Sequence, residues 1–179
     1  RDLDERIHAR IERGMARRGI LYPWWVPTTC LVGQLLSTVV ALAQRDALWP
    51  LGPMTATLLL VLVSPVVHFG FGGWLPWWLD GLSVVAAAAV LMADPVGSGI
   101  DLAPALLALV TAELVARDGL RAGAAVGLVS AVVIVATEVA ADLDSYGVYL
   151  LEVVLGFVVG AMLWWQMRAL AAEREARAR

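Results

Sequence analysis

Six apolar stretches, separated by short polar turns, follow one another along most of the chain. Residues 86–89, for example, are four consecutive alanines, without the apolar and polar alternation of a lipid-facing strand. A membrane-spanning helix needs about 20 mostly apolar residues, so the pattern predicts an all-α, polytopic membrane protein with a six-helix transmembrane bundle. The predicted spans are residues 24–43, 51–68, 75–93, 102–116, 122–141 and 146–165.

The first twenty residues follow a different, amphipathic pattern. Leu3, Ile7, Ile11 and Met15 recur every four residues, and most of the surrounding arginines lie elsewhere around the helix. This spacing predicts an amphipathic helix within residues 1–21. Such a helix can lie on an anionic membrane surface or pack on a neighbouring subunit, and the sequence leaves both alternatives open.

The last apolar stretch runs into a polar segment that keeps its helical character. Residues 166–179 contain no glycine or proline and are rich in alanine, glutamate and arginine. Every third or fourth position, alternately, can form a coiled-coil seam: Trp165, Ala169, Ala172, Ala176 and Arg179. We therefore expect three regions: a cytoplasmic amphipathic helix (1–21), a transmembrane domain (22–165) and a cytoplasmic signalling helix that begins a coiled coil (166–179).

Composition supports the membrane assignment. Of 179 residues, 60% are hydrophobic and 16% charged, with a mean hydropathy of +0.78, whereas soluble domains have roughly 45–50% apolar and 25% charged residues. These values exclude a water-soluble globule and leave no room for a sizeable soluble domain beside six spans.

The arginines predict the orientation of the bundle. All thirteen basic residues are arginine, and twelve fall in the two terminal segments or in the turn that holds Arg117 and Arg121. Because basic residues of short loops stay on the cytoplasmic side, both termini are expected to be cytoplasmic in a bacterial inner membrane. Only Arg45 then lies on the outer side.

The sequence offers little for catalysis. Cys30 is the single cysteine, and His8 and His68 are the only histidines, so neither a disulfide framework nor a zinc or redox site is expected. No phosphate-binding loop, zinc-protease motif or serine triad occurs. We predict no catalytic centre, metal, cofactor or nucleic-acid site within residues 1–179.

Ionisable residues within spans are the first functional candidates, because burying a charge in lipid is costly. Glu113 and Arg117 lie four residues apart, the spacing of an ion pair on one helix face, and a structural pair is expected, with Arg117 extending to the cytoplasmic boundary. Asp80, near Trp77 and Trp78, is expected to cap a helix or reach the same boundary.

Four acidic residues gather at the outer ends of the fifth and sixth spans: Glu138, Asp142, Asp144 and Glu152. Two neighbouring carboxylates that are partly shielded from water can share a proton or hold a cation. They are the candidate signal-sensing residues. The alternative is that they are merely solvated helix ends.

Small and polar residues predict where helices touch. Gly156 and Gly160 form a small-residue contact motif, and with Trp165 and Ala169 they are candidates for signal transmission or helix packing. Gly123 and Gly127 repeat the same spacing. A polar stripe on the first span, Cys30, Gln34, Ser37 and Thr38, is expected to form hydrogen bonds between helices.

The arginine-rich start, the compact six-span block and above all residues 168–179 (RALAAEREARAR) resemble the membrane input region of actinobacterial sensor histidine kinases. The resemblance implies a homodimer that relays a membrane or envelope signal through its last helix. It also implies a kinase core, absent from residues 1–179, which would bind ATP and magnesium and transfer phosphate to a response regulator. No catalytic residue of that family can be assigned here, because neither histidine matches a phosphoacceptor motif.

Two other functions remain open. In a small transporter or transporter subunit, Glu113, Glu138 and Glu152 would face a central polar pathway, although the spans lack the broken midplane helices of many transporters. A non-catalytic membrane scaffold would instead use its terminal helices to recruit a partner.

Overall fold

The computed structural model describes residues 25–45, 51–71, 75–94, 96 and 101–178. Within these ranges the chain forms helices and turns, with no strand. The helices are α2 (Trp25–Ala43), α3 (Leu51–Pro65) with the π-helical turn η1 (Val66–Gly70), α4 (Trp77–Met92), α5 (Ala103–Asp118), α6 (Leu120–Ala140) and α7 (Tyr146–Ala178). Each predicted span coincides with one of these helices, and the predicted amphipathic helix (1–21) lies outside the described residues.

Local sequence explains where several helices start and change. Pro76 precedes α4, and Pro104 lies in the first turn of α5, where a missing N–H breaks no helical hydrogen bond. Gly119, with φ +96°, turns the chain directly from α5 into α6. In α3 the ring of Pro65 cannot continue the regular hydrogen-bond pattern, and the helix widens into η1 immediately after it.

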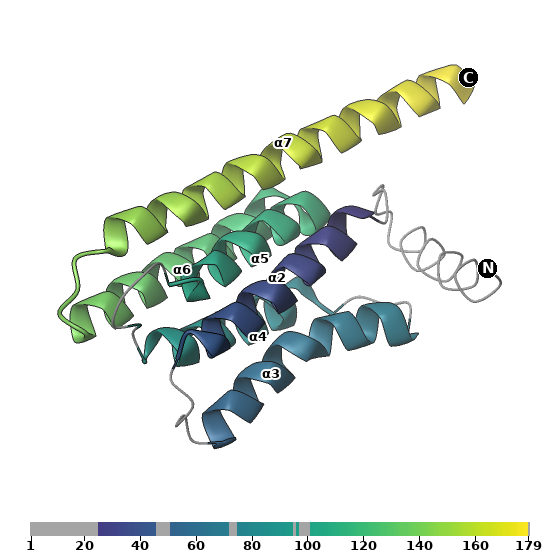
Figure 1. The fold of residues 1–179 in the computed structure, drawn as a ribbon. Coiled ribbons are helices and arrows are strands. Elements are labelled where there is room, and N and C mark those ends of the chain that lie inside the picture. The colour runs from purple at the N-terminus through teal and green to yellow at the C-terminus, as the bar shows by residue number, and fades with distance from the viewer. Residues whose placement is uncertain (1–24, 46–50, 72–74, 95, 97–100, 179) are drawn as a thin grey trace.

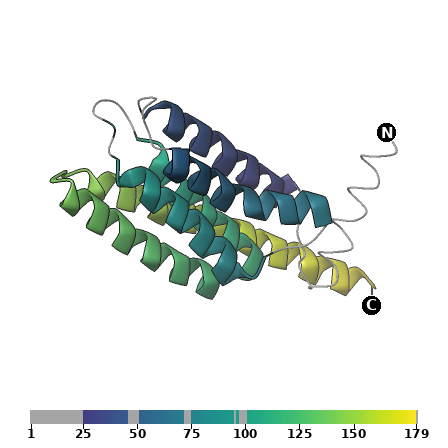
Figure 2. The ribbon, with the colours of Figure 1, turned by 90° about the horizontal axis from the view of Figure 1, so that it is seen from below.

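Helix α5 is the centre of the bundle. It packs against α2, α4, α6 and α7, while α3 covers α2 and α4 on one side (Figures 1 and 2). Its apolar side chains Leu106, Leu107, Val110 and Leu114 are completely buried. Protein rather than lipid therefore surrounds most of α5, which explains how a helix of 16 residues with charged side chains can lie inside this molecule.

In the part of the chain that the structure describes, three helices are long and apolar enough to cross a membrane: Gly52–Gly70, Leu120–Ala140 and Tyr146–Glu173. Thr28–Ala43 and Trp77–Met92 are apolar but shorter. The chain is thus an all-helical protein with the character of a membrane protein. The six-span arrangement goes beyond these three helices and remains a prediction.

Helix α7 differs from the others in length and exposure. It runs for 33 residues without interruption, and its C-terminal part extends past the rest of the bundle (Figure 1). Only 11% of its most apolar window is buried inside the chain. Most of its surface is therefore available to lipid, solvent or another protein.

Candidate functional site

A charged cluster lies around the C-terminal half of α5. Arg117 Nη1 donates to Asp80 Oδ2 at 2.7 Å and to Glu113 Oε1 at 3.1 Å, and its Nε donates to Asp118 Oδ2 at 2.7 Å. On the other side of Glu113, Gln34 Nε2 donates to Oε2 at 2.8 Å. We call these five residues the Arg117 cluster, which links α2, α4 and α5.

The Arg117 cluster is almost fully shielded from solvent. The side chains of Asp80, Glu113 and Arg117 are at most 1% exposed, whereas that of Asp118 is 28% exposed. Within the described residues Asp80 Oδ1 has no hydrogen-bond partner. Two buried carboxylates therefore share a single guanidinium.

The Arg117 cluster corrects two sequence-based expectations. The Arg117 side chain does not reach solvent but is buried, because Asp80 and Glu113 offer it charge-assisted hydrogen bonds within the bundle. Asp80, in the first turn of α4, does not reach solvent either, since it is completely buried and bonded to Arg117. The predicted contact between Glu113 and Arg117 is present. Asp80 was missed as a partner because it lies 37 residues away in the sequence.

A second charged cluster lies at the opposite end of α5. Arg45, just after α2, donates from Nε to the Leu91 carbonyl at 2.7 Å and from Nη1 to the Ala41 carbonyl at 2.8 Å. Its two terminal nitrogens also bind both oxygens of Asp101, at 3.3 and 2.9 Å. Arg45 and Asp101, with the two carbonyls, form what we call the Arg45 clamp.

The Arg45 clamp joins the end of α2, the end of α4 and the start of α5. Asp101 Oδ1 also accepts the backbone N–H of Ala103, the first residue of α5, at 2.9 Å, so it holds the start of α5 as well as Arg45. From sequence, Arg45 stands out only as the single arginine on the predicted outer side. Its isolation among apolar stretches is a signal for a buried partner, but the pattern does not identify which one.

The predicted sensing residues lie in three different environments. Glu138 is buried and accepts a hydrogen bond from the backbone of Ser145, while its Oε2 has no partner among the described residues. Glu152 is half-buried, and Asp142 and Asp144 are exposed on the turn between α6 and α7. Both Glu138 and Glu152 lie within electrostatic range of Asp101.

The structure thus brings Glu138 and Glu152 to the end of the bundle that holds the Arg45 clamp, but it leaves the two turn aspartates in solvent. Across the described residues, no group of three or more His, Cys, Asp or Glu side chains could hold a metal ion. This end of the bundle is an acidic surface around one arginine.

The predicted small-residue contacts lie within the chain. A methyl group at Gly156 would overlap the carbonyl of Ala108, and one at Gly160 would overlap that of Ala112, so α7 approaches the α5 backbone closely. Gly123 of α6 similarly packs on Val115 of α5. These glycines pack helices of one chain together, and the face of α7 that carries Gly156 and Gly160 is already occupied by α5.

The other predicted transmission residues, Trp165 and Ala169, are exposed on α7. Their neighbour Trp164 lies beside Gly119, at the turn between α5 and α6, and the guanidinium of Arg168 lies 4.4 Å above its ring. Of the predicted polar stripe, Gln34 forms a hydrogen bond between helices, whereas Thr38 donates to the Gln34 carbonyl of its own helix at 2.8 Å.

No protein-family model, curated protein or solved structure matches this chain.

Proposed function

We propose that this chain is the transmembrane sensor domain of a two-component histidine kinase, in which α7 relays a membrane or envelope signal to a cytoplasmic kinase core. One observation carries the proposal: α7 is a single helix of 33 residues that packs on the central helix and then extends past the bundle. A displacement of its bundle part is therefore transmitted without a break to its exposed end.

Helix α5 couples the Arg117 cluster to α7. Ala108 and Ala112 present their carbonyls to Gly156 and Gly160, and the next turn of the same helix carries Glu113 and Arg117. A change in the charge or packing of the cluster shifts α5, and α7 follows because the two backbones touch. A two-state movement of this kind is how packed helices transmit signals.

An exposed apolar seam on α7 supports a homodimer. Eight positions alternate by four and three residues and are all exposed in the single chain: Leu151, Leu155, Val158, Met162, Trp165, Ala169, Ala172 and Ala176. In a parallel coiled coil of this register, Arg168 and the second copy's Glu173 occupy the flanking positions that form ion pairs between helices. The seam faces away from the α5 contact, so pairing leaves the bundle intact.

The proposal includes six spans with both termini in the cytoplasm of a bacterial cell. The kinase core would bind ATP and magnesium, and its partner would be a response regulator. Reading the gene beyond codon 179 tests this directly: a histidine-bearing dimerisation helix followed by an ATP-binding domain supports the proposal, and an immediate stop codon overturns it.

Cross-linking tests the α7 seam. In a Cys30→Ala background, Ala172→Cys places a thiol on the seam, whereas Ala171→Cys places it on the opposite side of the same helix. Oxidation in nanodiscs should give a disulfide-linked dimer for Ala172→Cys and little for Ala171→Cys. Equal cross-linking of both variants would rule out this seam as the dimer interface.

The buried carboxylates of the Arg117 cluster favour one alternative, a proton-coupled transporter, because Glu113 lies between α2, α4 and α5 as a central pathway residue would. Liposomes that contain the chain and a trapped pH dye distinguish the two functions. A transporter would conduct protons in a way that Glu113→Gln abolishes, whereas a sensor domain should leave the pH gradient intact.

A further inference from the structure

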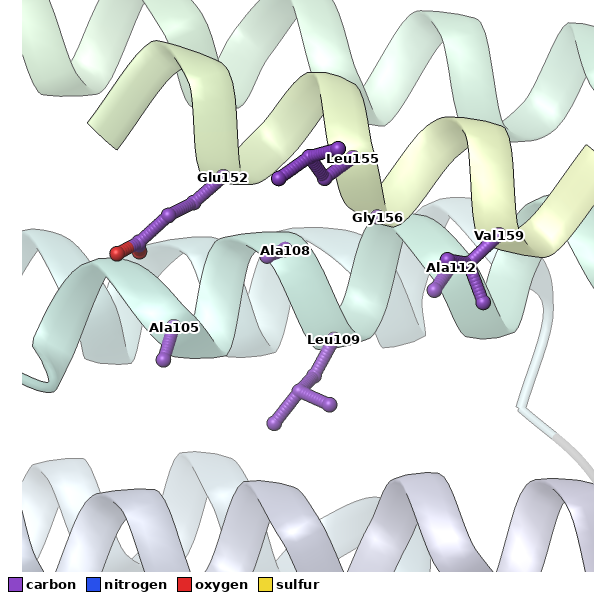
Figure 3. A pocket seen from close by; sticks show the side chains of 8 residues that line it. All are labelled: Ala105, Ala108, Leu109, Ala112, Glu152, Leu155, Gly156 and Val159. Atoms are coloured by element: carbon purple, nitrogen blue, oxygen red, sulfur yellow. The ribbon is translucent and has the colours of Figure 1, made fainter. Parts of the chain in front are cut away.

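A groove runs between the central helix and α7 (Figure 3), and Leu155 and Val159 on its α7 wall are exposed. It has a volume of about 410 Å³ and is lined by Ala105, Ala108 and Ala112 of α5 and by Glu152, Leu155 and Val159 of α7, among others. The small alanine side chains of α5 leave the groove open beside the close contact of Gly156 with Ala108. Its volume lies in the range of small-molecule sites.

Among the described residues, Glu152 is the only ionisable one that lines this groove. Figure 3 shows its carboxylate at one end, extending from α7 towards α5 near Ala105. Within the described residues, the Glu152 carboxylate accepts no hydrogen bond and forms no ion pair. The charged residue nearest in effect, Asp101, is also acidic and is already bound to Arg45. The groove is therefore apolar along its length and carries an uncompensated negative charge at one end.

The position of Glu152 matches the geometry of a membrane amphiphile. It lies six residues after the start of α7, or roughly 9 Å along the axis at about 1.5 Å per residue, and Val159 lies roughly 10 Å deeper. With the start of α7 at the bilayer surface, half of a bilayer about 40–45 Å thick, head-group regions included, therefore contains the groove. In the orientation proposed above this is the outer half, so a ligand can enter from the outer leaflet.

A second groove shows what the carboxylate adds. It lies between α4 and α6, has a volume of about 210 Å³, and is lined by Trp77, Trp78 and apolar residues without an ionisable group. Such a surface can accommodate an alkyl chain but cannot select a head group. The groove between α5 and α7 has both apolar walls and a carboxylate at one end.

We propose that the groove between α5 and α7 binds a single-chain cationic amphiphile, with its ammonium group at Glu152 and its alkyl chain along Ala108, Ala112 and Val159. The cation offsets the cost of holding a carboxylate at the membrane boundary, and the chain covers the apolar walls. The binding itself needs no kinase. Its role as a signal rests on the proposed sensor function, because the ligand would touch both α5 and α7 at their contact.

Radiolabelled dodecyltrimethylammonium provides the test, with the chain in phosphatidylcholine nanodiscs and empty nanodiscs as the background. We expect a saturable component of about one ligand per chain that dodecanol and dodecyl sulfate do not displace at equal concentration. Glu152→Gln should weaken this component at least tenfold, and the matched Glu173→Gln variant, on the exposed end of α7, should leave it unchanged.

A second variant tests the apolar part of the groove independently of the charge of Glu152. Ala108→Leu should fill the groove and abolish the saturable component, whereas Ala124→Leu, on an exposed position of α6, should retain it; circular dichroism verifies that both variants fold. Equal binding of dodecanol, or full binding by Glu152→Gln, would show that the groove holds ordinary lipid chains only and would overturn the proposal. Neither result depends on signalling, so the proposed function stands or fails separately.

Discussion

Arg117 shows how single residues hold this bundle together at considerable cost. Removing a charge from water costs several kcal/mol, and the attraction to its partners repays that cost only when the geometry is good. Arg117 meets this condition with three carboxylates at 2.7–3.1 Å. Deleting one member of the cluster is therefore costly, because it leaves its charged partners buried without a counter-charge.

We therefore expect Arg117→Ala to lower the free energy of unfolding by about 3–5 kcal/mol, since Asp80 and Glu113 would remain buried without a counter-ion. Denaturant titration in detergent micelles, followed by circular dichroism, measures the effect. The control is Arg177→Ala, because Arg177 is 84% exposed and lies 3.9 Å from Glu173.

A triple variant tests the same prediction in a second way. Asp80→Asn, Glu113→Gln and Arg117→Met together remove all three buried charges, so most of the lost stability should return. If Arg117→Ala costs no more than Arg177→Ala, the Arg117 cluster does not stabilise the bundle in the way the distances indicate.

At the Arg45 clamp, the planar guanidinium matters more than the charge. Lysine carries one ammonium group and cannot bind Asp101 through two parallel bonds while also reaching Leu91 and Ala41. Arg45→Lys should therefore cost about 1–3 kcal/mol in the same titration, by the loss of buried hydrogen bonds. The exposed Arg121→Lys should change the stability little, and an equal loss in both variants would contradict a specific clamp.

At this scale the sequence predicts local pairs and misses distant ones. The four-residue spacing of Glu113 and Arg117 is enough to predict their contact, because a helix fixes the neighbours of each position. Asp80 and Asp101 could not be assigned to their arginines, since no rule of spacing relates residues of different helices. A buried arginine among apolar stretches indicates that some carboxylate must meet it, and only the fold identifies that carboxylate.

At the scale of elements, the contact between α5 and α7 depends on the absence of side chains. Gly156 and Gly160 allow α7 to lie directly on the carbonyls of Ala108 and Ala112. The glycine spacing predicts close packing of the sixth span. It does not say whether the partner is another helix of the chain or a second copy, and here the glycine face meets α5.

Alanine substitutions separate packing from helix propensity. Gly156→Ala or Gly160→Ala should lower the free energy of unfolding by about 1–3 kcal/mol, because the added methyl group forces the helices apart. Gly147→Ala is the matched control on the same helix, where a methyl group meets nothing within 4 Å. There the higher helix propensity of alanine should raise the stability by up to about 1 kcal/mol. A gain at all three positions would exclude the close contact.

The extents of the helices follow from the sequence because apolar stretches and turn formers alternate so regularly. The central position of α5 does not. Its shortness and its charges, taken alone, predict a poor membrane span, and only its burial by four neighbours explains them. The π-helical turn after Pro65 was likewise not predicted, since a proline can end or kink a helix as readily as widen it.

For the whole molecule, the predicted orientation can be tested with thiol labelling of intact cells. In a Cys30→Ala background we expect a membrane-impermeant maleimide to label Asp94→Cys and Asp144→Cys, because both turns are on the predicted outer side. Arg121→Cys and Arg177→Cys should react only after the cells are opened. Labelling of Arg177→Cys and Asp144→Cys from the same side would show that α7 does not cross the membrane.

The two arginine sites connect three helices of the bundle but not α7. The Arg45 clamp and the Arg117 cluster tie α2, α4 and α5 to one another near both ends of α5. Between α7 and the other helices, by contrast, the described residues form no ion pair. A small axial slide of α7 therefore breaks no charged contact, and the contacts that oppose it are those of Gly156 and Gly160 with the carbonyls of Ala108 and Ala112.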